Sequence, residues 1–354
     1  MSDFIEIALI SKILLRWYVK NGRVLPWRVS PKDSESGHTP DPYKVWISEI
    51  MLQQTTVKTV IPYFQKFIEK WECIDKLSHA NEGEVLAFWA GLGYYARGRN
   101  LLKCAKELRD RFNSKIPNDK KKLLSLPGIG EYTASAIRSI AFGEKEVVID
   151  ANIERVICRL FKIEKPIKQA KKDIKECASQ LFAKFHSGDL AQALMDFANS
   201  ICKPKKPFCD QCPISRSCLS FKCAVVESIP AKPIKKNKPI KTGYVFFVSL
   251  KPNKFLLERR PSKGILGGLL GFPTTKWDVE KNEPTFPFQA NWFYTGRVVT
   301  HQFSHFKLEL EIVFGETEYS KFDNSKYFVA KRQNFDLSSL PTLMRKVYIR
   351  SNIL

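Results

Sequence analysis

No apolar run in this sequence of 354 residues approaches the length needed to span a bilayer. The opening stretch, MSDFIEIALISKILLRWYVK, also lacks the basic start and the small-residue cleavage site of a signal peptide. Instead, Glu6, Lys12 and Arg16 interrupt an apolar pattern at helical spacing. We see no internal repeat, and we expect a soluble, cytoplasmic protein.

Acidic residues are scarce: 36 Asp and Glu stand against 58 Lys and Arg, which leaves a formal net charge of +22. A surplus of this size indicates a polyanionic partner, most often nucleic acid. Lysines that only solvate the surface would give the same composition. The hydrophobic content of 44% excludes a disordered or collagen-like chain. The length suffices for roughly two or three domains.

A disulfide framework is not expected, because the nine cysteines belong to a large chain without secretory features. The stretch CKPKKPFCDQCPISRSC concentrates four of them at the spacing C-x6-C-x2-C-x5-C. These four are Cys202, Cys209, Cys212 and Cys218. So short a run predicts a metal or cluster site held by four thiolates.

The apolar periodicity divides the chain. Up to about residue 225 the spacing is helical, as in NIERVICRLF. Residues 226–242 include a Pro- and Lys-rich stretch without acids, which is typical of an extended linker. From residue 243 to 354 the period changes to two: YVFFVSL and FLLERR flank KPNK as a hairpin, and HFKLELEIVFG alternates as a half-buried strand.

The stretch LPGIGEYTASAIRSIAFG places Gly128 and Gly130 in a tight turn just before a helix. Such a turn exposes backbone N–H groups at a helix N-terminus, which is an anion site suited to a DNA phosphate. Many ordinary helix-to-helix turns use glycine in the same way. The amphipathic stretch before the turn favours a helix-hairpin-helix unit.

Two carboxylates are candidates for catalysis. Asp150 in VVIDAN precedes a helix, where it serves equally well as an N-cap, and the two roles are compatible. Glu49 in PYKVWISEIMLQQT falls among apolar neighbours on a predicted helix. Burial there would raise the pKa of Glu49 toward that of a proton donor near neutral pH. The alternative is a partly exposed glutamate at the helix edge.

Together, the hairpin, the aspartate and the cysteines resemble the helix-hairpin-helix DNA glycosylase superfamily. In its endonuclease III and MutY branches such cysteines bind a 4Fe-4S cluster. A four-cysteine zinc site remains the other interpretation, although zinc favours two C-x2-C pairs and the present spacing suits a cubane better. The loop would then aim its basic side chains at DNA; these are Lys203, Lys205, Lys206 and Arg216.

Tyr132 in GIGEYT stands where bifunctional relatives carry a nucleophilic lysine. Because tyrosine cannot form a Schiff base, strong lyase activity is not expected. The stretches LPWR, DPYKVWISEIMLQQT and GLGYYARGRN are similar to those of the adenine-specific MutY family, and this resemblance runs through nearly all of residues 20–220. The family usually has glycine where this chain has Ala151.

The resemblance implies a role for each carboxylate. Glu49 would protonate N7 of adenine, and Asp150 would stabilise the oxocarbenium-like sugar or capture it covalently, in the two-carboxylate logic of glycoside hydrolysis. Tyr132 and Asn152 would support this pair. The flipped base would be surrounded by Arg23, Trp27 and Arg28. DNA contacts would come from Leu52, Gln53, Gln54, Tyr94, Arg97, Gly128 and Gly130.

The C-terminal stretch FLLERRPSKGILGGLLGFP resembles the start of a NUDIX fold. The acidic helix that NUDIX hydrolases need for metal is absent, since TTKWDVEKNEPTFPFQ follows. We therefore expect a NUDIX-like reader without pyrophosphatase activity. The segment HQFSHF matches the family loop that senses 8-oxoguanine opposite adenine, through Phe303, Ser304 and His305; the alternative is an ordinary strand start.

These expectations describe a multidomain α + α/β protein. An all-helical glycosylase domain at 1–225 would combine a barrel (about 31–140) with a cluster subdomain (about 1–30 and 141–225), and a NUDIX-like α/β domain would follow at 243–354. We expect a monomeric, monofunctional glycosylase, nucleoid-associated, that removes adenine opposite 8-oxoguanine or guanine. The alternatives are an endonuclease III-like glycosylase and lyase, a non-catalytic DNA-binding protein, and a nucleotide pyrophosphohydrolase.

Overall fold

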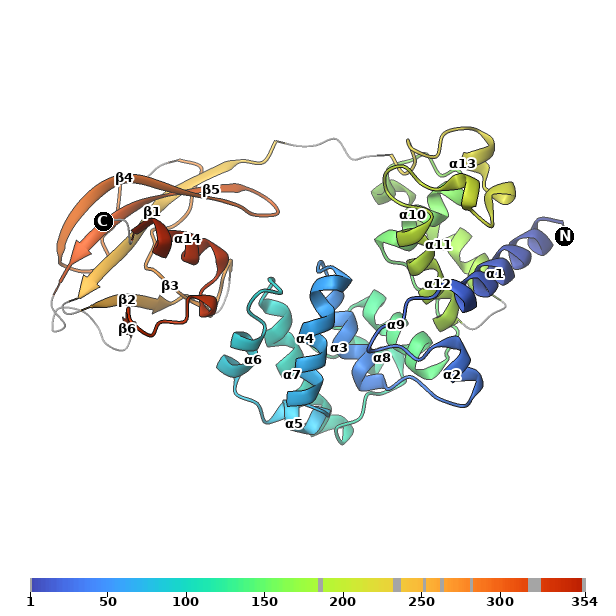
Figure 1. The fold of residues 1–354 in the computed structure, drawn as a ribbon, viewed down its shortest axis with the longest axis horizontal. Coiled ribbons are helices and arrows are strands. Elements are labelled where there is room, and N and C mark those ends of the chain that lie inside the picture. The colour runs from blue at the N-terminus through green and yellow to red at the C-terminus, as the bar shows by residue number, and fades with distance from the viewer. Residues whose placement is uncertain are drawn as a thin grey trace. The chain divides into compact units, whose positions relative to one another are not determined.

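The computed structural model comprises two compact units, Met1–Glu82 with Arg99–Ile234 and Gly83–Gly98 with Lys235–Leu354 (Figure 1). The structure describes residues 2–183, 187–231, 237–250, 253–261, 264–280, 283–317 and 326–351. The middle of the predicted linker, residues 232–236, lies outside these ranges. None of the helices in the described ranges has the length and apolar character needed to cross a membrane.

The first unit is helical. Its helices are α1 (Ser2–Asn21), α2 (Pro31–Glu35), α3 (Pro42–Leu52), α4 (Val57–Lys70), α5 (Ile74–Ser78), α7 (Ala96–Phe112, which begins in the second unit), α8 (Lys120–Leu124), α9 (Glu131–Phe142), α10 (Ala151–Leu160), α11 (Ile167–Phe182), α12 (Ser187–Ser200) and α13 (Leu219–Lys222). Two 3-10 turns, Cys209–Gln211 and Ser215–Ser217, lie in the cysteine stretch. The helix α6 (Glu82–Phe88) begins at the boundary between the units.

Local sequence fixes where these helices begin. The carboxylate of Asp41 accepts a hydrogen bond from the amide of Tyr43, and Pro42 occupies the first turn of α3.

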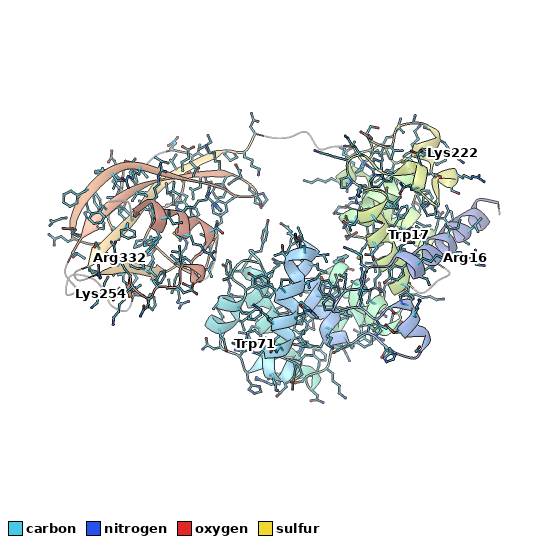
Figure 2. All side chains as sticks on the ribbon, viewed as in Figure 1. Arg16, Trp17, Trp71, Lys222, Lys254 and Arg332 are labelled. Carbon is cyan, nitrogen blue, oxygen red and sulfur yellow. The ribbon has the colours of Figure 1, made fainter. Side chains whose placement is uncertain are left out.

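Around α10, the apolar face predicted from NIERVICRLF is buried and packs with α1, α11 and α12 in one core, to which Leu14, Ile157 and Leu194 belong. Basic side chains such as Arg16 and Lys222 are exposed instead (Figure 2).

The second unit contains a six-stranded sheet in the order β3-β2-β1-β5-β4, with β6 paired to β2. The strands are β1 (Ile240–Leu250), β2 (Lys254–Arg259), β3 (Leu270–Gly271), β4 (Asn291–Gln302), β5 (Lys307–Glu316) and β6 (Tyr327–Lys331). The predicted hairpin is confirmed, since β1 and β2 pair antiparallel through Ser249 and Phe255. The predicted half-buried strand is also confirmed as β5, which runs parallel to β1.

One apolar cluster of the sheet includes Phe247 and Leu310 and packs with α14 (Thr342–Ser351), which contributes Met344 and Val347. A second cluster gathers around Phe246, Val248 and Val313. Within the described residues, the connection from β3 to β4 forms no helix. The chain there instead bridges to β1, at Val245 with Thr274 and at Thr242 with Asp278.

Candidate active site

A cavity of about 750 Å³ opens in the helical unit. It is lined by side chains from α3, α9, α12, the start of α10, and the segment before α2. Ten residues singled out from the sequence line it: Arg23, Trp27, Arg28, Glu49, Leu52, Gln53, Gln54, Tyr132, Asp150 and Asn152. The fold therefore brings together residues that lie far apart along the chain.

Glu49 is almost fully buried on α3, with 7% of its surface exposed. Burial raises the pKa of Glu49 to about 7; the hydrogen bond from Tyr132 and the charge of Arg28 oppose this rise, and the charge of Asp150 adds to it. A substantial fraction of Glu49 therefore carries a proton at neutral pH. The alternative of an exposed glutamate at the helix edge is wrong.

Tyr132 lies in the first turn of α9, where its side chain hydrogen-bonds Glu49. Burial, together with the charges of Glu49 and Asp150, raises the pKa of Tyr132 well above its usual value. The phenol is therefore a neutral hydrogen-bond donor, and it keeps the carboxyl group of Glu49 oriented.

Asp150 is the N-cap of α10: its Oδ1 accepts a hydrogen bond from the amide of Ile153 at 2.7 Å. Its Oδ2 accepts from Asn152 Nδ2 at 2.8 Å. The N-terminus of a helix is a favourable place for a negative charge. The carboxylate is thus fixed on both oxygens at the wall of the cavity, and Asn152 contacts it directly.

Asn152 is linked in turn to the cysteine loop. The guanidinium of Arg155 donates to Asn152 Oδ1 at 3.3 Å and to the carbonyl oxygen of Cys202 at 3.0 Å. The same group donates to the carbonyl of Ala198 at 2.9 Å. A continuous chain of hydrogen bonds therefore runs from the carboxylate of Asp150 to the backbone of the first clustered cysteine.

Arg23 and Arg28 converge on Asp196, a residue that sequence reasoning missed. Arg23 donates to Asp196 from its amide at 2.8 Å and from Nε at 2.7 Å, and Arg28 donates from Nη1 at 2.8 Å. Burial alone would raise the pKa of Asp196, but the two arginines hold it below its usual value. A carboxylate within the apolar stretch ALMDFANS was the available signal.

Replacing Asp196 by asparagine should destabilise the protein by ~3–5 kcal/mol, since it leaves the buried guanidinium of Arg28 without its counter-charge. Urea unfolding measures this, with Asp173→Asn as the matched control, because Asp173 forms a solvent-accessible ion pair with Lys165. The stability that Asp196 provides is present above ~pH 4, the pKa of an unfolded aspartate, and is lost as pH falls through the lower folded pKa. Equal unfolding free energies for both variants would contradict this assignment.

Other lining residues were also missed, namely Gln192, Met195 and Asn199 on α12. Trp27 lines the cavity while its ring packs edge-on against Phe64, with centroids 5.2 Å apart. Gln192 is buried, with 5% of its surface exposed. Its amide can both donate and accept hydrogen bonds, which suits the polar edge of a base.

Two of the DNA-contact candidates, Gln54 and Tyr94, adopt a left-handed backbone conformation. Gln54 follows the end of α3 and is exposed with a φ of 57°; Tyr94 is 48% exposed with a φ of 47°. Left-handed backbone in such residues is strained and is concentrated at functional sites. Gln53 lies between Leu52 and Gln54, and its Nε2 is 3.5 Å from Thr133 Oγ1.

Arg97 and Tyr94 belong to the second unit. The guanidinium of Arg97 donates to the carbonyls of Leu92 and Gly93 at 2.9 and 3.2 Å and lies over the Tyr94 ring. Burial lowers the pKa of Arg97 to about 10. In the structure, Arg97 braces the turn that presents Tyr94. The hydroxyl of Tyr94 lies 2.8 Å from that of Ser304.

The predicted hairpin joins α8 to α9. Gly128 has a φ of 81°, and a Cβ added there would lie 3.0 Å from the Cβ of Asn100, so glycine is required on two counts. Gly130 is the N-cap of α9 and supplies no side-chain cap. The first amides of α9 are therefore available to an anion such as a phosphate.

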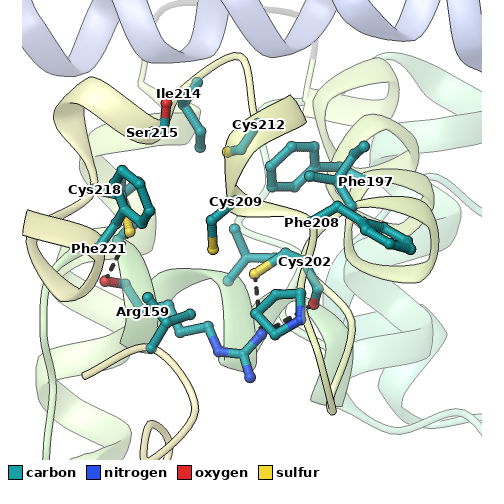
Figure 3. Close-up of a pocket in the computed structure, with 15 residues that line it drawn as sticks. Arg159, Phe197, Cys202, Phe208, Cys209, Cys212, Ile214, Ser215, Cys218 and Phe221 are labelled. Carbon is teal, nitrogen blue, oxygen red and sulfur yellow. Dashed lines mark hydrogen bonds between the residues drawn. The ribbon is translucent and has the colours of Figure 1, made fainter. Parts of the chain in front are cut away.

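The four clustered cysteines line one small, largely apolar pocket, and Figure 3 shows their sulfurs directed toward a common space. The buried Arg159 donates from Nη1 to Cys202 Sγ at 3.4 Å and accepts from Cys218 Sγ through its carbonyl at 3.4 Å. Among the described residues, no three His, Cys, Asp or Glu side chains are placed to hold a single metal ion. One zinc would require each sulfur ~2.3 Å from the ion.

In the second unit, the segment His301–Phe306 connects β4 to β5. Ser304 and His305 are exposed at its tip, whereas Phe303 is half-buried against the core. The amide of Phe303 donates to the carbonyl of Phe306 at 2.9 Å and closes a tight turn. The two polar side chains are thus presented to solvent from a well-defined loop.

Both parts of the chain are similar to known protein families. Residues 47–184 match the HhH-GPD superfamily of base excision DNA repair proteins, and residues 244–350 match the NUDIX domain. A Buchnera aphidicola (strain Bp) protein named adenine DNA glycosylase is 40% identical over 261 residues, 73% of this chain and 72% of that protein. The human protein of that name is 30% identical, over 98% of this chain and 74% of its own length. The solved structure of a thermostable thymine-DNA glycosylase gives a TM-score of 0.55 at 29% identity, covering 63% of this chain and 100% of the other.

Proposed function

Since the chain belongs to the adenine DNA glycosylase family, we propose that it removes adenine mispaired with 8-oxoguanine or guanine from duplex DNA. Hydrolysis of the N-glycosidic bond would leave an abasic site for other enzymes of base-excision repair. The observation that carries this proposal is the pairing, in one cavity, of Glu49 at a pKa of about 7 with the fixed carboxylate of Asp150. We expect the protein to act as a monomer on the nucleoid in the cytoplasm.

Adenine must leave the base stack before reaction, and the cavity would receive it. Glu49 in its protonated form would donate to N7 and make the base a better leaving group. The resulting carboxylate would then act as a base toward the attacking water. Tyr132 holds Glu49 in position by its hydrogen bond and, as a phenol, offers no amine for attack on the sugar.

Asp150 would stabilise the positive charge that develops on the sugar, because its two oxygens are held by Ile153 and Asn152. Arg23, Trp27 and Arg28 would surround the flipped base, with Asp196 fixing both arginines. Gln54 and Tyr94 would enter the duplex near the vacated position, with Leu52 and Gln53 beside them. The Gly128–Gly130 turn would bind a backbone phosphate.

In the second unit, Ser304 and His305 would hydrogen-bond the base opposite the adenine. Both are exposed, and the hydroxyl of Tyr94 lies 2.8 Å from that of Ser304. The stretch TTKWDVEKNEPTFPFQ stands where NUDIX hydrolases carry their acidic metal-binding helix, which supports a reader more than a nucleotide pyrophosphohydrolase.

We infer that Cys202, Cys209, Cys212 and Cys218 hold a 4Fe-4S cluster. The common space between their sulfurs supports a group bound by all four, and the spacing of one C-x2-C pair with two outlying cysteines suits a multi-iron cluster better than zinc. When bound, such a cluster supplies a covalent crosslink and a redox-active centre. The residues of the chain do the rest: Arg159 ties the loop to α10 through several carbonyls.

Cys212→Ala should lose iron and lower the unfolding temperature markedly, because a structural metal group contributes folding free energy directly. The exposed Cys223 just outside the loop is the matched control, and Cys223→Ala should keep full iron content and stability. Iron analysis and thermal unfolding of the purified proteins measure both. If the Cys212→Ala variant retains its full iron content, Cys212 is not a ligand of the cluster.

Product analysis with and without hot alkali tests the proposed reaction. Duplexes carry one adenine opposite 8-oxoguanine, guanine or thymine. We expect strand breaks only after alkali, fastest opposite 8-oxoguanine and absent opposite thymine, because Tyr132 cannot form the Schiff base a lyase needs. Breaks without alkali would favour the endonuclease III-like alternative, and intact duplexes throughout would favour a non-catalytic DNA-binding protein.

A further inference from the structure

The loop that presents Ser304 and His305 rests on a stacked column of aromatic rings. Trp277 stacks on Phe303 with centroids 5.9 Å apart and planes 29° apart, and Phe303 stacks on Phe306 at 4.9 Å and 29°. Cations cover both ends: Arg260 lies 4.6 Å from the centroid of Trp277, and Lys241 lies 5.3 Å from that of Phe306. We call these five residues the stacked column.

Backbone contacts with β1 hold Trp277 in place. The amide of Thr242 donates to the carbonyl of Asp278 at 2.7 Å, and the amide of Asp278 donates back to Thr242 at 3.2 Å. Gly243 leaves room for the indole: a Cβ there would lie 3.2 Å from Trp277 Cδ1 and 3.0 Å from Thr275 Oγ1. Trp277 is therefore a buried residue, 9% exposed, in the connection between β3 and β4 that is hydrogen-bonded to β1.

Other groups also hold the turn: β4 and β5 pair up to Gln302 and Lys307, and the ring of His301 packs edge-on against that of Phe303 with centroids 4.7 Å apart. Lys238 Nζ donates to the carbonyl of Phe303 at 3.2 Å, and Gln302 Nε2 donates to the same carbonyl at 3.2 Å. Both are long side chains at exposed positions. The side chain of Phe303 belongs to the column, while Ser304 and His305 are exposed. Ring stacking therefore adds a side-chain connection between the sheet and the tip to the backbone hydrogen bonds of the β4–β5 hairpin.

We propose that Trp277 is a positioning residue for recognition of the base opposite adenine: its ring sets Phe303, which sets the direction of Ser304 and His305. This inference rests on the proposed function of the loop. It assigns Phe303 to the support of the loop and leaves contact with the base to Ser304 and His305. A misplaced tip would lose hydrogen bonds to 8-oxoguanine and leave the catalytic cavity untouched.

The test compares Trp277→Leu, which keeps an apolar side chain without a flat ring, with Trp277→Phe, which restores a ring. Single-turnover rates of adenine release are measured opposite 8-oxoguanine and opposite guanine. We expect Trp277→Leu to reduce the ratio of the two rates by roughly two- to tenfold, the range of a lost aromatic pair, while the rate opposite guanine stays unchanged. Trp277→Phe should restore most of the ratio.

Two further variants distinguish a specific effect of the stacked column from a general loss of folding. Gly243→Ala would crowd Thr275 and Trp277 without removing the indole, and we expect it to lower the ratio in the same direction. Trp292→Leu is the matched control, because Trp292 packs with Phe246 and Phe288 in the other apolar cluster; it should keep the ratio. Circular dichroism checks that each protein is folded.

His305→Ala separates failure of this inference from failure of the proposed function. If wild type prefers 8-oxoguanine and His305→Ala loses that preference, while Trp277→Leu and Gly243→Ala both keep it, the column does not position the loop. Equal losses opposite both bases would also overturn the inference, since they would mark a general effect on folding. A wild-type protein without preference would overturn the partner assignment and this inference together.

Discussion

Glu49→Gln should lower the single-turnover rate of adenine release by ~10²–10⁴, the usual contribution of a general acid. Glutamine has the same shape and retains the hydrogen bond with Tyr132, but it cannot transfer a proton to N7. The exposed Glu69→Gln on α4 is the matched control and should behave as wild type. A Glu49→Gln rate within a few-fold of wild type would remove Glu49 from the acid role.

The rate of adenine release should depend on pH through the titration of Glu49. Because the pKa of Glu49 is about 7, the wild-type rate should fall as pH rises above ~7, where the proton donor is lost, and the residual rate of Glu49→Gln should not show this step. The measurement is a pH–rate profile under single turnover. A wild-type rate that stays level well above pH 7 would contradict the assignment.

The folding stability of the protein should also depend on pH through Glu49. The folded pKa of Glu49 lies above that of an unfolded glutamate, so the native state binds the extra proton and loses stability as pH rises between the two values. Glu49→Gln should therefore be more stable than wild type at pH 8 by roughly 1–3 kcal/mol, with the difference smallest near pH 4. Urea unfolding at both pH values checks this.

Asp150→Asn should lower the rate of adenine release by ~10²–10³, as expected when a charge aimed at the developing transition state is removed. Asparagine is as good an N-cap as aspartate, so α10 should begin at the same residue and the unfolding free energy should change little. This variant separates the catalytic role of Asp150 from its structural one.

The comparison with Asp150→Ala completes that experiment. Alanine removes the charge and the cap together, so it should match the asparagine variant in rate and lose a further ~1 kcal/mol of stability. Single-turnover kinetics and urea unfolding measure the two effects separately. An asparagine variant with full activity would mean that Asp150 is only a cap.

The helices, the strands and their buried faces could largely be predicted from the sequence, because these features depend on residues that are close together along the chain. The alternation in HFKLELEIVFG identified β5, and the apolar spacing in NIERVICRLF identified the buried face of α10. The apolar neighbours of Glu49 in PYKVWISEIMLQQT indicated its burial. These inferences needed only the periods of helix and strand.

Long-range contacts could not be predicted in the same way. Asp196 pairs with Arg23 and Arg28 across 173 and 168 positions, and no local pattern links these segments. The stacked column likewise joins Trp277 to Phe303 from separate connections of the sheet. The left-handed backbone conformation of Gln54 could not be predicted from the sequence either, because residues other than glycine rarely adopt a positive φ.

Free adenine released by the intact protein from a duplex with adenine opposite 8-oxoguanine would show the proposed activity directly. We expect adenine as the free base, one per abasic site formed, from a DNA strand that stays unbroken until alkali is added. No free adenine from this duplex, with the protein folded and bound to the DNA, would contradict it.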